Sequence, residues 1–87
     1  MTTVIAYHDV KDTEHWLAST VRDEAFATLG ITGIRTFVDP TNPRRVGILV
    51  DVPDMDALAE AMQSEAFAEA EAKDGVIPET IVMLVEA

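Results

Sequence analysis

The chain has 87 residues, of which 16 are Asp or Glu and 6 are Lys or Arg, giving a formal net charge of −10 at pH 7. This length predicts one domain over residues 1–87, and the negative charge argues against nucleic acid and membrane surfaces as partners. The sequence has no cysteine, which excludes disulfides, zinc–thiolate sites and cysteine nucleophiles. Without a basic leader or a membrane-length apolar run, the expected location is the cytoplasm.

The first predicted strand, Val4–His8, is short and rich in β-branched and aromatic residues. We expect a helix to follow from Glu14 to Leu29, with Asp12 or Thr13 as its N-cap and Gly30 as its C-terminal stop. Four apolar residues at i, i+4 spacing predict one buried face for this helix. They are Leu17, Val21, Ala25 and Leu29.

Two further strands, Ile34–Val38 and Val46–Val52, are predicted to form a hairpin around the dense turn signal Asp39–Pro43. The strand Val46–Val52 is strongly apolar along its whole length. Strands that are apolar on both faces need cover on both faces.

A second helical stretch begins at Asp54, the expected N-cap, and ends at Gly75, with a fresh helix start expected at Ser64. Three apolar residues share one of its faces: Met55, Leu58 and Met62. Its acidic residues are interpreted as a solvated face. They are Glu60, Glu65, Glu69, Glu71 and Asp74.

The last predicted strand, Thr80–Val85, follows Pro78 and completes the order β-α-β-β-α-β. Right-handed crossovers then favour a ferredoxin-like α+β fold, a four-stranded antiparallel sheet with both helical segments on one face. Two helical segments cover only one face of such a sheet. The open face is therefore expected to pack against a second copy, which makes the protein a homodimer.

The run from His8 to Trp16 resembles the His-x-Val-x-Asp-x-x-x-Trp opening of small proteins of the dimeric α+β barrel superfamily, described as antibiotic-biosynthesis-monooxygenase-like. Further short segments are similar to the turns and helix ends of that group, and together they cover nearly the whole chain. They are Leu29-Gly30-Ile31, the Asp39–Pro43 hairpin, Val52-Pro53-Asp54, Ser64-Glu65-Ala66-Phe67 and Asp74-Gly75-Val76.

This resemblance implies two ferredoxin-like subunits packed sheet to sheet, with a pocket in each subunit between sheet and helices. The superfamily includes cofactor-independent oxygenases of polycyclic phenols, haem-degrading enzymes, isomerases and polyketide cyclases. The haem-degrading branch is a poor match, because its axial histidine lies on the second helical stretch and this chain has none between Pro53 and Gly75. The Trp, Asn, Tyr and Arg set of the phenol oxygenases has no position-by-position counterpart here.

His8 is the first candidate catalytic residue. Side chains alternate along a strand, so at most one of His8 and Tyr7 faces such a pocket. A neutral imidazole there would act as a general base or hydrogen-bond a phenolic or keto group. The alternative is a structural histidine that ties the strand to the helix near Asp12.

Glu24 is the second catalytic candidate, because it lies close to the predicted buried stripe of the first helix. Desolvation would raise its pKa and suit it to proton transfer, and pairing with Arg35 is the structural alternative. Trp16 either lines a pocket or packs the helix against the end of the strand. The remaining candidate ligand-binding residues are either pocket lining or ordinary core: Tyr7, Arg35, Phe37, Met62, Phe67 and Met83.

Neither a metal nor a cofactor is expected. His8 and His15, with Asp9 and Asp12, do not have a familiar metal-ligand spacing. The chain also has no Gly-rich phosphate loop and no nucleotide fingerprint.

The sequence therefore predicts a homodimer that binds a small apolar or aromatic molecule, as a cofactor-independent monooxygenase, isomerase or cyclase. The alternative is a non-catalytic structural or protein-interaction module. The sequence decides neither this choice nor the substrate and reaction.

Overall fold

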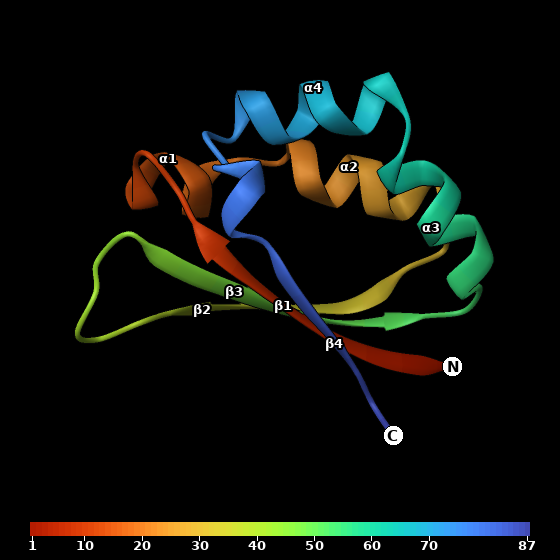
Figure 1. Cartoon of the computed structure of the whole chain (residues 1–87). Helices are drawn as coiled ribbons and strands as arrows, with labels where there is room; N and C mark the ends of the chain where they lie inside the picture. The colour runs from red at the N-terminus through yellow and green to blue at the C-terminus, as the bar shows by residue number, and fades with distance from the viewer.

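The four strands form one antiparallel sheet in the order β2-β3-β1-β4 in a computed structural model that describes all residues 1–87 (Figure 1). β3 separates β1 from β2, and β1 separates β3 from β4, so each β-α-β crossover leaves room for a strand of the other. The ferredoxin-like α+β fold predicted from the sequence is confirmed. The strands are β1 (Thr2–Asp9), β2 (Thr32–Val38), β3 (Arg45–Val52) and β4 (Val82–Val85).

All the helices lie on one face of this sheet (Figure 1). Asp12 caps the first through its carboxylate, which accepts from the His15 backbone N–H at 3.3 Å. Asp54 and Ser64 cap the helices that follow β3, as their positions in the sequence predicted. No helix has both the length and the apolar character needed to cross a membrane. The helices are α1 (Thr13–Ala18), α2 (Val21–Ala27), α3 (Met55–Met62), α4 (Glu65–Lys73) and the 3-10 turn η1 (Pro78–Thr80).

The single helix expected from Glu14 to Leu29 is wrong, because the chain breaks into α1 and α2 at Ser19. Ser19 has extended backbone angles, φ −72° and ψ 140°, and its hydroxyl accepts from the backbone N–H of Val21. Serine favours such local bonds at helix ends over a place in a helix interior.

This break changes which side chains of the segment are buried. An i, i+4 stripe holds only while one helix continues, and the phase resets at Ser19. Leu17 is 45% exposed, whereas Trp16 and Phe26 are 1% and 7% exposed and supply the core contacts. The predicted position of Leu17 in the core is therefore wrong.

The fourth strand also begins later than expected. Residues 78–80 form η1, with Pro78 at its start, and the Thr80 hydroxyl accepts from the backbone N–H of Asp9 at 2.9 Å. This hydrogen bond gives the backbone N–H of Asp9, at the end of β1, a partner outside the ladder with β4. Proline pre-sets φ for the first position of a helical turn, which explains why the strand begins only at Val82.

The core lies between the sheet and the helices. Inward-facing residues of β1 pair with inward-facing residues of β3: Val4 with Val50, Ala6 with Ile48 and His8 with Val46. All six are buried. The alternation of β1 thus places His8 under the helices.

The other face of the sheet is apolar and uncovered in the single chain. Ile5 pairs with Leu84 on one side and with Leu49 on the other, and Tyr7 pairs with Val82. Ile5, Leu84, Tyr7 and Val82 are 44%, 55%, 37% and 38% exposed. We call this surface the open sheet face; it also includes Phe37, which pairs with Gly47.

Replacement of Trp16 by Ala should lower the free energy of unfolding by about 3–5 kcal/mol, the usual range for a buried large aromatic residue. Leu17→Ala, one position along the same helix, should change it by less than about 0.5 kcal/mol because Leu17 is exposed. Urea denaturation of both variants measures the difference. Equal destabilisation by the two substitutions would contradict the observed phase of α1.

Candidate functional site

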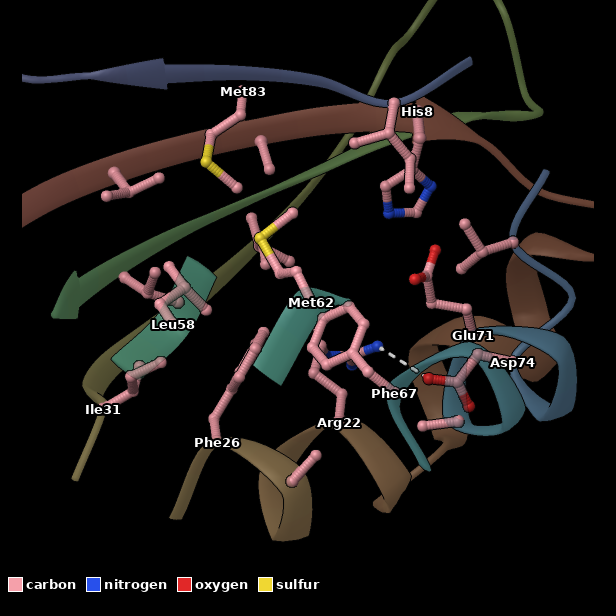
Figure 2. Close-up of a pocket in the computed structure, with 18 of the residues that line it drawn as sticks. His8, Arg22, Phe26, Ile31, Leu58, Met62, Phe67, Glu71, Asp74 and Met83 are labelled. Atoms are coloured by element: carbon pink, nitrogen blue, oxygen red, sulfur yellow. Dashed lines mark ion pairs between the residues drawn. The ribbon is translucent and has the colours of Figure 1, made fainter. Parts of the chain in front are cut away.

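A cavity of about 100 Å³ lies between the inner face of the sheet and helices α2, α3 and α4 (Figure 2). Fifteen of its 19 lining residues are hydrophobic, so most of its wall is apolar. The four polar residues are His8, Arg22, Glu71 and Asp74. The apolar wall is formed by Val4, Ala6, Trp16, Ala25, Phe26, Ile31, Ile48, Val50, Leu58, Met62, Phe67, Ala70, Val76, Ile81 and Met83.

The polar residues gather at one end of the cavity. In Figure 2 the His8 ring and the Glu71 carboxylate point toward one another, with Arg22 and Asp74 joined by an ion pair beside them. They come from three segments far apart in the sequence: β1, α2, and α4 with its C-cap. The cavity therefore has an apolar body and one polar end.

His8 is 7% exposed and packs edge-on against Trp16, with ring centroids 5.7 Å apart and an interplanar angle of 79°. Its Nδ1 atom is buried without a hydrogen-bond partner. Burial lowers the pKa of the imidazole from its ordinary 6.5 and outweighs the opposing interaction with the Asp9 backbone; the Arg22 charge also lowers this pKa, and the charges of Asp9 and Asp74 raise it. The neutral ring is the form that can accept a proton.

Arg22 is held in place by Trp16 and Asp74. Its guanidinium lies 4.2 Å from the centroid of the Trp16 ring, and Nη1 donates to the Trp16 carbonyl at 3.2 Å. The same nitrogen lies 3.8 Å from Asp74 Oδ2, and the Ser19 hydroxyl donates to the other oxygen of Asp74. Among the nitrogens of the Arg22 side chain, Nε is the one that is buried without a hydrogen-bond partner.

Glu71 faces the cavity from α4. Burial raises the pKa of its carboxyl above the ordinary 4.5, and Oε2 is buried without a hydrogen-bond partner. A carboxyl with a raised pKa keeps its proton to a higher pH than a free carboxyl does.

The interpretation of Glu71 and Asp74 as part of a solvated acidic face is wrong. Asp74 is 4% exposed and Glu71 is partly buried, although Glu65 and Glu69 on the same helix are exposed. Phe67, Ala70, Glu71 and Asp74 recur at i, i+3, i+4 and i+7 and all line the cavity. This helical spacing from Phe67 was the available signal, but acidic residues in a buried stripe are uncommon because burial disfavours charge.

Five of the residues proposed from the sequence meet at the cavity: His8, Trp16, Met62, Phe67 and Met83. Tyr7 and Phe37 lie on the open sheet face, as the strand register requires once His8 points inward. Arg35 is on that face too, with its guanidinium carbon 5.6 Å from the centroid of the Phe37 ring. These three side chains do not line the cavity.

Glu24 is exposed and does not line the cavity either, and it forms no ion pair with Arg35. The inward side of α2 is occupied by Arg22, Ala25 and Phe26. Sequence reasoning followed an i, i+4 stripe from Leu17 across the break at Ser19, which placed Glu24 too close to the core. Arg22 was missed for the same reason.

His15 lies outside the cavity. Its Nε2 is 2.7 Å from the carbonyl oxygen of Lys73, at the C-terminal end of α4. No group of three or more His, Asp or Glu side chains is arranged so that it could hold one metal ion.

The two buried groups give opposite contributions to the pH dependence of stability. The lowered pKa of His8 stabilises the fold fully above pH 6.5, and this contribution is lost as the pH falls below that value, because the unfolded chain binds the proton more readily. The raised pKa of Glu71 stabilises the fold fully below pH 4.5, and this contribution is lost as the pH rises through the folded pKa.

Glu71→Gln should therefore raise the melting temperature relative to the parent protein at pH 7.5 more than it does at pH 4. His8→Gln should show the reverse dependence and gain most as the pH falls from 7.5 to 5.5. Thermal melts across this range test both signs, with Glu69→Gln on the exposed side of α4 as the control. Differences that do not change with pH would contradict the burial of the two groups.

Comparison with solved structures finds this fold elsewhere. A Bordetella bronchiseptica protein provisionally named an antibiotic biosynthesis monooxygenase has a TM-score of 0.72 and 21% identity, covering 99% of this chain and 94% of its own. A Caulobacter crescentus protein with the same provisional name gives 0.67 and 19%, with 98% and 86% coverage. A conserved protein from Methanosarcina mazei gives 0.63 and 14%, with 98% and 90% coverage.

No protein-family model matches the chain, and no curated protein matches it in sequence. At identities of this size, the structural likeness establishes the fold and leaves the activity open. The chain has the ferredoxin-like α+β fold of the antibiotic-biosynthesis-monooxygenase-like proteins.

Proposed function

We propose that the protein is a homodimeric α+β barrel that binds a small, largely apolar molecule and acts on it without a bound cofactor. The observation that carries the proposal is a buried imidazole of lowered pKa at the polar end of an otherwise apolar cavity. Oxygenation, isomerisation and cyclisation are the reaction classes that a proton handler in such a site serves. The names of the structural neighbours support the first of these.

His8 is the residue proposed to handle the proton. Its ring is neutral at pH 7 because burial lowers its pKa, so Nδ1 is free to take a proton from a bound molecule. The Arg22 Nε–H belongs to the same end of the cavity and would donate a hydrogen bond to a substrate oxygen on which negative charge develops. The apolar wall would bind the rest of the molecule and exclude water.

The dimer is proposed from the open sheet face. A contiguous apolar patch on the surface of a small protein marks an interaction site, and here it includes residues of all four strands. A second copy packed sheet to sheet would cover Ile5, Tyr7 and Leu84 with the same residues of its partner. This patch also supports the alternative function, a non-catalytic module that acts through protein contacts.

Leu84→Glu, on the open sheet face, should convert the dimer to a monomer because it places a charge where the two sheets would meet. Leu49→Glu, on the same face, should have the same effect. Native mass spectrometry gives the subunit count of each variant. Leu17→Glu, at an exposed position on α1, is the matched control and should remain a dimer.

A dimer that persists in both Leu84→Glu and Leu49→Glu would contradict the proposed interface. A parent protein that is monomeric at micromolar concentration would contradict the dimer itself.

The protein purified from its own host should retain a discrete extra mass in native mass spectra, since the cavity would bind a small molecule during expression. A clean protein mass would favour the non-catalytic alternative.

His8→Gln, which fills most of the buried space of the imidazole, should keep a melting temperature within about 3 °C of the parent at pH 7.5, because the role proposed for His8 is chemical. A loss of more than about 10 °C would instead support a structural role for His8.

A further inference from the structure

Three buried side-chain atoms in this protein lack a hydrogen-bond partner, and all three belong to residues of the same cavity. They are His8 Nδ1, Arg22 Nε and Glu71 Oε2. Buried polar groups in folded proteins are nearly always paired, so each exception needs an explanation. Three exceptions from three different elements at one end of one cavity point to a common cause.

Neither His8 nor Arg22 can turn to solvent for a partner. His8 is 7% exposed and the Arg22 side chain is 9% exposed. Trp16 packs against both of them, edge-on to the His8 ring and beneath the Arg22 guanidinium. Figure 2 shows the Glu71 carboxylate directed at the same end of the cavity. The three residues therefore line the same cavity and are held by their packing, with the His8 ring and the Glu71 carboxylate directed at one another.

The hydrogen-bonding capacities of the three atoms restrict the group that fits between them. Arg22 Nε–H is always a donor, so the group must accept. Glu71 Oε2 accepts when the carboxyl is ionised and can donate when it is protonated, and His8 Nδ1 depends on the tautomer. A hydroxyl both donates and accepts, so it pairs with Arg22 and with at least one of the other two in every protonation state.

Charge excludes two other head groups. A carboxylate would place a negative charge beside Glu71 and Asp74, and it has no proton to donate. An ammonium would place a positive charge beside Arg22, and it has no lone pair for Nε. The Arg22 charge is already balanced by Asp74 at 3.8 Å, so this end of the cavity does not call for a counter-ion.

The cavity also limits the size of the molecule. A cavity of about 150 Å³ with an apolar lining holds one benzene molecule. The space of about 100 Å³ here fits a body of one small ring or a short branched chain, with its head group at the polar end.

We propose that the cavity recognises an uncharged alcohol with a body of this size, whose hydroxyl is held by His8, Arg22 and Glu71. The inference rests on the proposed function, because it requires that the cavity bind a small molecule. It adds Glu71 as a specificity-determining residue.

Four small-ring compounds of similar size test the proposal: cyclobutanol, methylcyclobutane, cyclobutylamine and cyclobutanecarboxylate. Trp16 is the only tryptophan and lines the cavity, so its fluorescence reports binding directly. Cyclobutanol should bind at least tenfold more tightly than each of the other three.

Variants of α4 assign the effect to Glu71. Glu71→Leu should reduce the preference for cyclobutanol over methylcyclobutane at least fivefold, and Glu71→Gln should keep it within threefold because an amide both donates and accepts. Glu69→Leu adds a similar apolar group at an exposed position of the same helix and should leave the preference unchanged. Thermal melts verify that each variant is folded.

The outcomes separate this inference from the proposed function. Equal binding of cyclobutanol and methylcyclobutane, or tightest binding of the amine or the carboxylate, would overturn the alcohol preference and leave the binding cavity intact. Failure of all four compounds to bind would contradict the cavity as a binding site, and the alcohol preference with it. An unchanged preference in Glu71→Leu would remove Glu71 from the recognition of the head group.

Discussion

The strict alternation of side chains along β1 is the constraint on which the rest of the structure depends. β1 lies between β3 and β4, so both of its edges are hydrogen-bonded. A slip of its register by one residue would move every side chain to the other face of the sheet. Val4, Ala6 and His8 point under the helices, and Ile5 and Tyr7 point away from them. A single strand thus supplies both the imidazole of the cavity and the centre of the open sheet face.

The polar end of the cavity exists because charged groups are buried there together. Arg22 forms an ion pair with Asp74 and donates to the Trp16 carbonyl, the Ser19 hydroxyl donates to Asp74, and the Trp16 ring provides a face for the guanidinium. Burial of such a set is tolerated only when it is well paired. Glu71 and His8 have less support, and burial shifts their pKa values toward the neutral forms. A pair of titratable groups whose neutral forms burial favours, beside a compensated cation, suits recognition of an uncharged polar group.

Much of the fold followed from local signals. Asp12, Asp54 and Ser64 were identified as helix caps because each offers a side-chain oxygen to the free N–H groups of a first turn. The candidate site was predicted less completely. His8, Trp16 and Phe67 follow from strand alternation and helix starts, whereas Arg22 and Glu71 required the phase of α2 and α4 relative to the sheet. The break at Ser19 reset the phase of α2, and a count of i, i+4 spacings does not reveal such a break.

The sequence by itself determined the order of the elements, their caps and turns, and the alternation that separates His8 from Tyr7. These depend on contacts within a few residues of the chain, and their chemistry is visible in the residue types. Only the tertiary structure decided that Glu71 and Asp74 leave the solvent and that Arg22 joins them beside Trp16. The reason is that the environment of a charged side chain is set by groups more than 45 residues away, such as Asp74 for Arg22, and local pattern carries no record of them.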